Sequence, residues 1–302
     1  MIKMKNKSDL ITIINKNKSK FSKSQTKIAA YITNHYEKGA FMTASALGKT
    51  VGVSESTVVR FASELGYDGY PEFQAELQDL IKNKLTSVQR MEITSSKMSD
   101  GEILRSVLQS DIDKLKRTRD TIDETQFLAA VDAVANADKI YILGARTCFS
   151  IASFLGFYLN FMSGNAVTIT TNSASETFEQ IYRANEKDVV IAVSYPRYSQ
   201  RTLNAVKYAY SKGSTVIAIT DSPNAPITDY AKHTLIATSD MSSFVDSLVA
   251  PLSLINALIV ALVVRNKEQV SKVFEEMEDI WDEYGVYKKH ITDESEFGGE
   301  NE

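Results

Sequence analysis

The sequence predicts a two-domain protein, in which a small helical domain precedes a doubly wound parallel α/β domain. Three observations support this fold class. The chain has 302 residues, which is enough for two separate cores. Apolar residues recur at helical spacing in the first part of the chain. From residue 138, short β-branched runs alternate with helical stretches, as in βαβ units. We expect a helical domain over 1–85, a linker and connecting helix over 86–125, an α/β domain over 126–265 and an acidic helical tail over 266–302.

The first domain reads as a series of short helices. Residues 22–36 place Ile28 and Ile32 on one face, and Ser22 or Ser24 can cap this helix. A second helix is expected over 43–51. The remaining signals are Gly52 as a turn, Ser54 as the N-cap of a third helix over 55–65, and Pro71 near the start of a helix within 66–85.

The second domain is introduced by a polar stretch and an amphipathic helix. The polar stretch at 86–102 is expected to be an interdomain linker, and the helix at 103–122 to join the domains or pair subunits. Five nearly continuous apolar runs follow, as expected for strands covered on both faces. The predicted strands are 139–144, 166–171, 188–194, 214–220 and 233–238.

Composition narrows the class of protein. The chain has one cysteine and three histidines, so we expect a cytoplasmic protein with no disulfide, no metal and no cofactor. The apolar run at 248–264 is short for a membrane span and contains Pro251, so a buried core or interface helix is expected instead.

Charge is distributed unevenly along the chain. Although the net charge is −4, residues 1–86 carry 13 Lys or Arg against 8 Asp or Glu. A polyanionic partner of the first domain would account for this excess, and so would a solubilising basic tail.

The third helix has two faces of different chemistry. At 100° per residue, Val58, Ala62 and Leu65 lie on one side, and Ser56 and Arg60 lie almost opposite. Two helices joined by a short turn at Gly52 form the pattern of a helix-turn-helix, whose second helix enters the major groove of DNA. A small helical bundle with a hydroxyl-rich surface has the same pattern.

If this helix reads DNA, its residues have definable roles. Small residues at its N-terminus allow close approach, and its first amides can meet a phosphate. Arg60 can contact a guanine edge or a phosphate, and Glu55 can accept from cytosine or orient Arg60. The predicted DNA-contacting residues are Lys49, Ser54, Glu55, Ser56, Thr57 and Arg60.

Two loops of the second domain predict an anion site. In open parallel sheets, ligands bind beyond the carboxyl ends of strands near the reversal of strand order. The loops at 144–150 and 194–202 both lead into helices and carry arginines with hydroxyls, which suits phosphate or carboxylate. The predicted ligand-binding residues are Arg146, Thr147, Ser194, Arg197, Tyr198, Ser199 and Thr202. The alternative is helix capping by Thr147 and Ser199, with the arginines on a solvated rim.

The stretches GVSESTVVRF and LGYDGYPEF strongly resemble the N-terminal domain of RpiR/MurR-type bacterial transcriptional regulators. The resemblance continues into the second half, which looks like a sugar isomerase (SIS) domain with flavodoxin-like strand order. It implies a homodimer or homotetramer that binds double-stranded operator DNA. It also implies that an anionic small molecule, a phosphosugar first among candidates, modulates DNA binding.

The two loops depart from the pattern of the family. The usual second loop reads roughly Ser-x-Ser-Gly-x-Thr, whereas this chain has SYPRYS, with Pro196 and Arg197 in place of serine and glycine. In the first loop, GARTC places Arg146 at a small-residue position. Either the site still binds an anion through the two arginines, or the class of ligand has changed.

Two other functions compete with regulation. A phosphosugar isomerase needs a positioned base and acid, and Glu176, Glu179 and His233 are the available residues, but no catalytic constellation emerges from them. A nucleoid-type or scaffolding module would bind DNA without sequence preference, or bind another protein. Cys148 at a helix start could form a redox switch, and a buried structural cysteine is the alternative.

Overall fold

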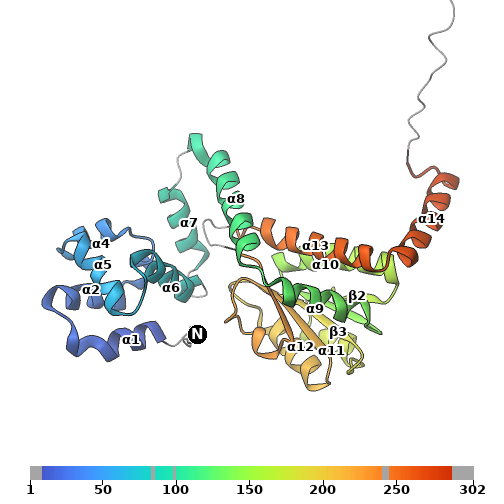
Figure 1. Ribbon diagram of the computed structural model, residues 1–302, viewed down its shortest axis with the longest axis horizontal. Helices are drawn as coiled ribbons and strands as arrows, with labels where there is room; N and C mark the ends of the chain where they lie inside the picture. Colours follow the sequence, from blue (N-terminus) through green and yellow to red (C-terminus); the bar gives the residue numbers. More distant parts are fainter. Residues whose placement is uncertain (1–8, 83–85, 98–99, 240–244, 288–302) are drawn as a thin grey trace, which may run out of the picture.

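The computed structural model of the protein describes residues 9–82, 86–97, 100–239 and 245–287. Figure 1 shows a helical N-terminal part and an α/β C-terminal part, joined by a helical connection. This is the fold class that the sequence predicts.

The N-terminal domain is a compact group of helices around an aromatic core. Ser22 forms a capping box with Gln25 at the start of the second helix, which fixes where that helix begins. The core is centred on Phe61, whose ring lies 5.2 Å from that of Phe21 and 5.8 Å from that of Phe73. The elements are α1 (Asp9–Asn17), η1 (Lys18–Lys20), α2 (Lys23–Asn34), α3 (Tyr36–Gly39), α4 (Ala44–Val51), α5 (Glu55–Glu64) and α6 (Tyr70–Lys82).

The connection between the domains is largely helical. The polar stretch expected as a linker contains α7 (Ser87–Lys97) and the turn η2 (Asp100–Glu102), and α8 (Ile103–Thr121) follows. In Figure 1, α7 and α8 lie between the two domains. The helix at 103–122 was predicted, whereas α7 was not, because its sequence SVQRMEITSSK has only weak helical amphipathicity.

The C-terminal domain is built on a five-stranded parallel sheet in the order β2-β1-β3-β4-β5. This is the flavodoxin-like order of doubly wound folds. Every strand falls within a predicted run. The strands are β1 (Ile140–Gly144), β2 (Ala166–Thr168), β3 (Val189–Val193), β4 (Thr215–Thr220) and β5 (His233–Ile236).

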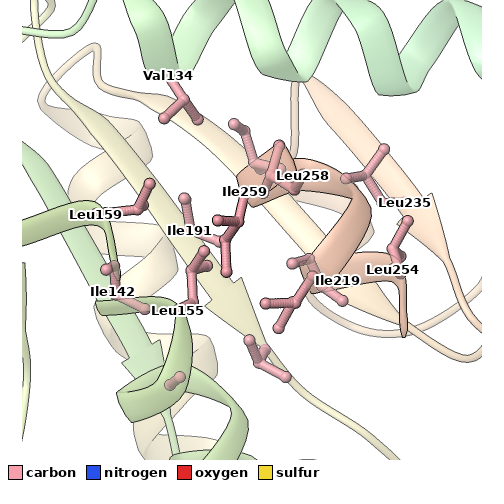
Figure 2. Packing of buried hydrophobic residues seen from close by; sticks show 14 of the residues in the cluster. Val134, Ile142, Leu155, Leu159, Ile191, Ile219, Leu235, Leu254, Leu258 and Ile259 are labelled. Carbon is pink, nitrogen blue, oxygen red and sulfur yellow. The ribbon is translucent and has the colours of Figure 1, made fainter. Parts of the chain in front are cut away.

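Helices cover both faces of this sheet, which explains why its strands are apolar throughout. On one face, side chains of α9, α10 and α13 meet those of the strands, as Figure 2 shows for Leu155, Leu258 and Ile191. On the other face, α11 and α12 pack on a second cluster that includes Val190. The helices are α9 (Glu124–Ala135), α10 (Thr147–Ser163), α11 (Ala174–Ile181), α12 (Gln200–Ser211) and α13 (Val249–Arg265).

The apolar run at 248–264 forms α13, with Leu254, Ile255, Leu258 and Leu262 buried in the core. The final helix, α14 (Lys267–Glu283), turns away from it and packs Phe274 against Phe161 of α10. Within the described residues, no single helix has the length and apolarity to cross a membrane. Only α13 and α14 taken together pass by length and composition, and they are bent by 98°.

Candidate functional site

The residues predicted to be functional gather in two places, and the first is the pair of helices α4 and α5. Gly52 ends α4 in the left-handed conformation (φ 70°), which glycine adopts without steric cost. Gly48 allows the close approach of the two helices, since a Cβ there would lie 2.8 Å from the carbonyl oxygen of Val53. Ser54 then caps α5 by accepting a hydrogen bond from the Thr57 amide at 3.3 Å. These local features fix the predicted helix-turn-helix geometry.

The helix α5 is anchored on one side and free on the other. Val58, Phe61 and Ala62 are fully buried, whereas Ser56 and Arg60 are exposed. The Arg60 Nε donates to the Ser56 carbonyl oxygen at 3.3 Å, which lays the guanidinium along the helix surface. The predicted polar face is therefore present on the outside of the domain.

The predicted DNA-contacting residues lie around the start of α5 and the end of α4. Lys49, Ser54 and Glu55 are exposed, and Thr57 is half-buried. The Ser54 hydroxyl lies 2.8 Å from that of Thr57 and 3.0 Å from that of Ser56. The hydroxyls thus form one cluster at the helix N-terminus, where the helix dipole favours an anion such as phosphate.

The second place is a pocket at the carboxyl ends of β1 and β3. These neighbouring strands are followed by crossovers to opposite faces of the sheet, so the pocket lies where the strand order reverses. Its volume is about 210 Å³, below the roughly 300–1,000 Å³ of drug-sized ligand sites, so it suits a compact metabolite. The lining residues are Ser87, Arg90, Ala145, Arg146, Thr147, Cys148, Val193, Ser194, Tyr195, Pro196, Arg197, Ser199, Thr202, Val245 and Asp246.

Two arginines of this pocket have a backbone conformation that residues with a side chain rarely adopt. Within the described residues, Arg146 (φ 58°) and Arg197 (φ 66°) are the two non-glycine residues with positive φ. Such positions cost on the order of 1–3 kcal/mol each and cluster at binding sites. The backbone of Arg197 thus has a conformation typical of glycine, while its side chain adds a positive charge to the pocket.

Two residues that line the pocket carry buried hydroxyls with no hydrogen-bond partner within the described chain. These are the Ser194 hydroxyl and the Tyr195 hydroxyl, on residues that are only 2% and 5% exposed. Burial, followed by the nearby Asp221, raises the pKa of Tyr195 well above 10, so its hydroxyl stays protonated. Buried polar groups are nearly always satisfied, and two orphaned donors beside arginines match an anionic or hydroxyl-rich ligand.

The third wall of the pocket comes from α7. Arg90, which is only 3% exposed, binds the Asp246 carboxylate at 2.8 Å. The Arg197 guanidinium donates to the Ser87 hydroxyl at 3.0 Å. Ser87 and Arg90 are not among the predicted residues, because the polar stretch that contains them is typical of a linker. Asp246 is not among them either, because no motif surrounds it. The one local signal for this part of the site was the spacing of Ser87 and Arg90, which places both on one face of a helix.

Six of the seven predicted ligand-binding residues line this one pocket. The exception is Tyr198, whose hydroxyl donates to Asp221 at 2.9 Å and is not among the lining residues. Ser199 also caps α12 by accepting a hydrogen bond from the Thr202 amide at 3.3 Å. Ser199 therefore has the helix-capping role that was the alternative to ligand binding. In contrast, α10 begins after Arg146 with no side-chain cap.

The residues considered for catalysis do not converge on the pocket. Glu176 accepts from Thr171 at the start of α11. His233 begins β5, at the edge of the sheet, and burial lowers its pKa. Of the described lining residues, Asp246 is the only carboxylate. Among the described residues, no group of three or more His, Cys, Asp or Glu side chains is placed to hold a metal ion.

Cys148 lines the pocket but is a buried thiol. Burial raises its pKa to about 11, which outweighs the hydrogen bonds that lower it. A thiol with this pKa is almost fully protonated near neutral pH and is a poor nucleophile. This supports a structural role for Cys148 over the redox switch.

Comparison with known proteins agrees with this two-part architecture. The model described as "Helix-turn-helix domain, rpiR family" matches residues 8–84, and the SIS domain model matches residues 133–261. An uncharacterized HTH-type transcriptional regulator of Clostridium perfringens is 25% identical over 228 residues, covering 75% of this chain and 81% of the relative. Another from Haemophilus influenzae is 26% identical over 263 residues, covering 83% and 88%.

Two solved structures share the fold. The Vibrio vulnificus NanR protein complexed with ManNAc-6P has a TM-score of 0.57 at 22% identity, covering 91% of this chain and 99% of that one. The sugar isomerase domain of an RpiR transcription factor from Sphaerobacter thermophilus has a TM-score of 0.57 at 27% identity, covering 59% and 99%. The fold and site define a helix-turn-helix protein with a SIS domain. This chain combines a helix-turn-helix domain of the rpiR family over residues 8–84 with a SIS domain over residues 133–261.

Proposed function

We propose that this protein is a DNA-binding transcriptional regulator whose operator binding is modulated by an anionic small molecule in the β1/β3 pocket. The observation that carries the proposal is the pairing of an exposed recognition-type helix with a pocket that combines Arg146, Arg197 and orphaned hydroxyl donors. A phosphosugar is the leading class of effector, because phosphate suits the arginines and sugar hydroxyls suit Ser194 and Tyr195. The NanR protein, which has the same fold and is complexed with the phosphosugar ManNAc-6P, supports this choice.

A sensor is favoured over an isomerase. Glu176, Glu179 and His233 are absent from the residues that line the described pocket. Sugar isomerisation needs a base within hydrogen-bond reach of the substrate carbon-bound proton, and Asp246 is already paired with Arg90. We therefore propose binding without turnover, in the cytoplasm, where operator DNA and phosphorylated metabolites are both present.

The test is a titration of the purified protein against its own upstream DNA and a scrambled control. It is run by fluorescence anisotropy at two salt concentrations, with and without a panel of sugar phosphates. Specific, salt-sensitive binding that one sugar phosphate alters supports the proposal. Binding that ignores sequence would instead favour a nucleoid-type module, and turnover of a sugar phosphate would favour the isomerase.

Replacing Arg197 with glycine is expected to abolish the response to the anion without lowering thermal stability. The change removes a guanidinium from the pocket and its bond to Ser87. It also removes the steric strain of a non-glycine residue in the left-handed conformation, which is roughly 1–2 kcal/mol. The opposing term is the extra chain entropy of glycine in the unfolded state, about 0.5–1 kcal/mol. Calorimetric titration with the active sugar phosphate and a melting curve measure the two effects.

Arg197→Ala is the matched control for this prediction. It removes the same guanidinium but retains the positive φ of 66° on a residue with a Cβ. Both variants should lose anion binding, and the alanine variant should melt at a lower temperature than the glycine variant. Normal anion binding by either variant would exclude Arg197 from the site.

We also propose that the protein is a homodimer or homotetramer that uses α8 and α13. On α8, Leu104 is 72% exposed and Leu108 is 54% exposed, and on α13 Val264 is 72% exposed. Exposed apolar patches of this kind mark interaction surfaces. A two-fold assembly would place two α5 helices on half-sites one or more DNA turns apart.

Leu104→Glu is expected to shift the oligomer towards a smaller species, because a buried charge in an apolar contact is strongly unfavourable. Sedimentation velocity measures the mass over a range of concentrations. Gln109→Glu adds the same charge to a polar position of α8 and should leave the mass unchanged. An unchanged mass for Leu104→Glu would remove the face of α8 around Leu104 from the interface.

A further inference from the structure

We propose that Arg90 of α7 is part of the anion site, and that anion binding strengthens the docking of α7 on the C-terminal domain. This rests on the proposed function, because it uses the same pocket. It assigns a binding residue to the segment that connects the two domains. It also provides a route by which effector binding in the C-terminal domain changes the position of the DNA-binding domain.

The first support is the position of Arg90. Its side chain is 3% exposed, although it lies on a helix with exposed neighbours such as Val88 and Met91. It lines the pocket together with Arg146 and Arg197, which come from two other segments of the chain. Three arginines thus line one pocket, and Asp246 is the one carboxylate among its described lining residues. The lining carries an excess of positive charge that a phosphate dianion would neutralise.

The second support is the chemistry of the donors beside Arg90. Ser194 and Tyr195 line the same pocket, and their buried hydroxyls have no partner in the described chain. An anion that accepts from them would lie in the pocket that Arg90 also lines. Arg90 would then bind the anion on one side and Asp246 on the other, because a guanidinium carries five donors in a planar fork.

The third support is the short connection to the DNA-binding domain. The last residue of α6 is Lys82 and the first of α7 is Ser87, so five residue steps join the two helices. Five steps span at most about 18 Å. The position of α7 therefore limits where the helix-turn-helix domain lies. A ligand that binds better to the docked α7 shifts the population of domain arrangements by its differential affinity.

Replacing Arg90 and replacing Asp246 are expected to change the affinity for the anion in opposite directions. If Arg90 binds the anion, Arg90→Gln removes an attractive charge, and the affinity for anion falls on the order of tenfold to a hundredfold. Asp246→Asn removes a negative charge that repels the anion and competes for the Arg90 guanidinium, so affinity rises. If the pair is purely structural, both variants break the same contact, and affinity changes in the same direction in both.

The experiment is calorimetric titration of the full chain with inorganic phosphate. Wild type, Arg90→Gln, Asp246→Asn, Arg197→Gly and the control Arg105→Gln are compared. Arg105 is exposed on α8, so its replacement removes the same charge outside the pocket. Opposite shifts for Arg90→Gln and Asp246→Asn, with no shift for Arg105→Gln, support the proposal. Shifts in the same direction for Arg90→Gln and Asp246→Asn overturn it.

A second readout follows the docking of α7 directly. Hydrogen exchange of the amides at 88–92 should slow when phosphate is added to wild type and should not slow in Arg90→Gln. If phosphate binds wild type and only Arg197→Gly loses phosphate binding, the proposed role of Arg90 is wrong and the proposed anion site is still supported. If phosphate does not bind wild type at all, both proposals fail.

Discussion

Replacing Arg60 with alanine is expected to weaken specific operator binding by about 5- to 150-fold, or roughly 1–3 kcal/mol, if Arg60 reads a base. Arg60 is exposed on α5 and its Nε donates to the backbone of its own helix, so stability should not change. Fluorescence anisotropy with operator and scrambled DNA measures the loss, and a melting curve checks the fold.

The type of contact is decided by how the loss depends on DNA sequence and salt. If Arg60 contacts a guanine, affinity falls for the operator but little for scrambled DNA. If it contacts a phosphate, affinity falls for both and the salt slope decreases by about 1. Lys38→Ala, on α3, removes one charge outside the helix-turn-helix and is the matched control. Unchanged operator affinity in Arg60→Ala would show that α5 is not the recognition helix.

The second large effect is expected from Phe61→Ala, which should destabilise the N-terminal domain by about 3–5 kcal/mol. Phe61 is fully buried and its ring contacts those of Phe21 and Phe73. Its removal loses apolar burial and two aromatic contacts, and leaves a cavity at the base of α5. Against a typical stability of about 5–15 kcal/mol, this loss removes a large share of the free energy of unfolding of the domain.

The two domains can be followed separately in this experiment. The single tryptophan of the chain, Trp281, stacks on Phe161 in the C-terminal domain, so its fluorescence reports on that domain. In urea, circular dichroism should show an earlier transition in Phe61→Ala, while the fluorescence transition stays in place. Phe178→Ala, at a 38% exposed site on α11, should have a smaller effect. An unshifted circular dichroism curve for Phe61→Ala would contradict the role of Phe61 in the core.

The elements of this fold were largely predictable because their signals are local. Of the two caps considered for the 22–36 helix, Ser22 is the one used, and Ser54 caps α5 as expected. Thr43, where the second helix was expected to start, is the N-cap of α4. The five β-branched runs became the five strands of a parallel sheet, because both of its faces are covered and each strand is therefore apolar throughout. The faces of α5 followed from its helical period alone.

The pocket was predictable only in part. The loops after β1 and β3 were identified because parallel strands bring their carboxyl ends to one edge, and six of seven named residues line the pocket there. The sequence alone gave no reason to leave Tyr198 out of the ligand-binding residues, because its contact with Asp221 depends on where β4 ends. The positive φ of Arg146 and Arg197 could not be predicted from the sequence either, since no local rule places arginine in a conformation that favours glycine.

The sequence by itself determined the helical and α/β parts of the chain, the two helices joined at Gly52 and the loops that follow β1 and β3, because helix caps, helical periodicity and β-branched runs depend on neighbouring residues. Only the tertiary structure decided that α7 closes the pocket. Arg90 and Asp246 are 156 positions apart, and an ion pair over that separation exists only once the fold has buried Arg90 beside Asp246.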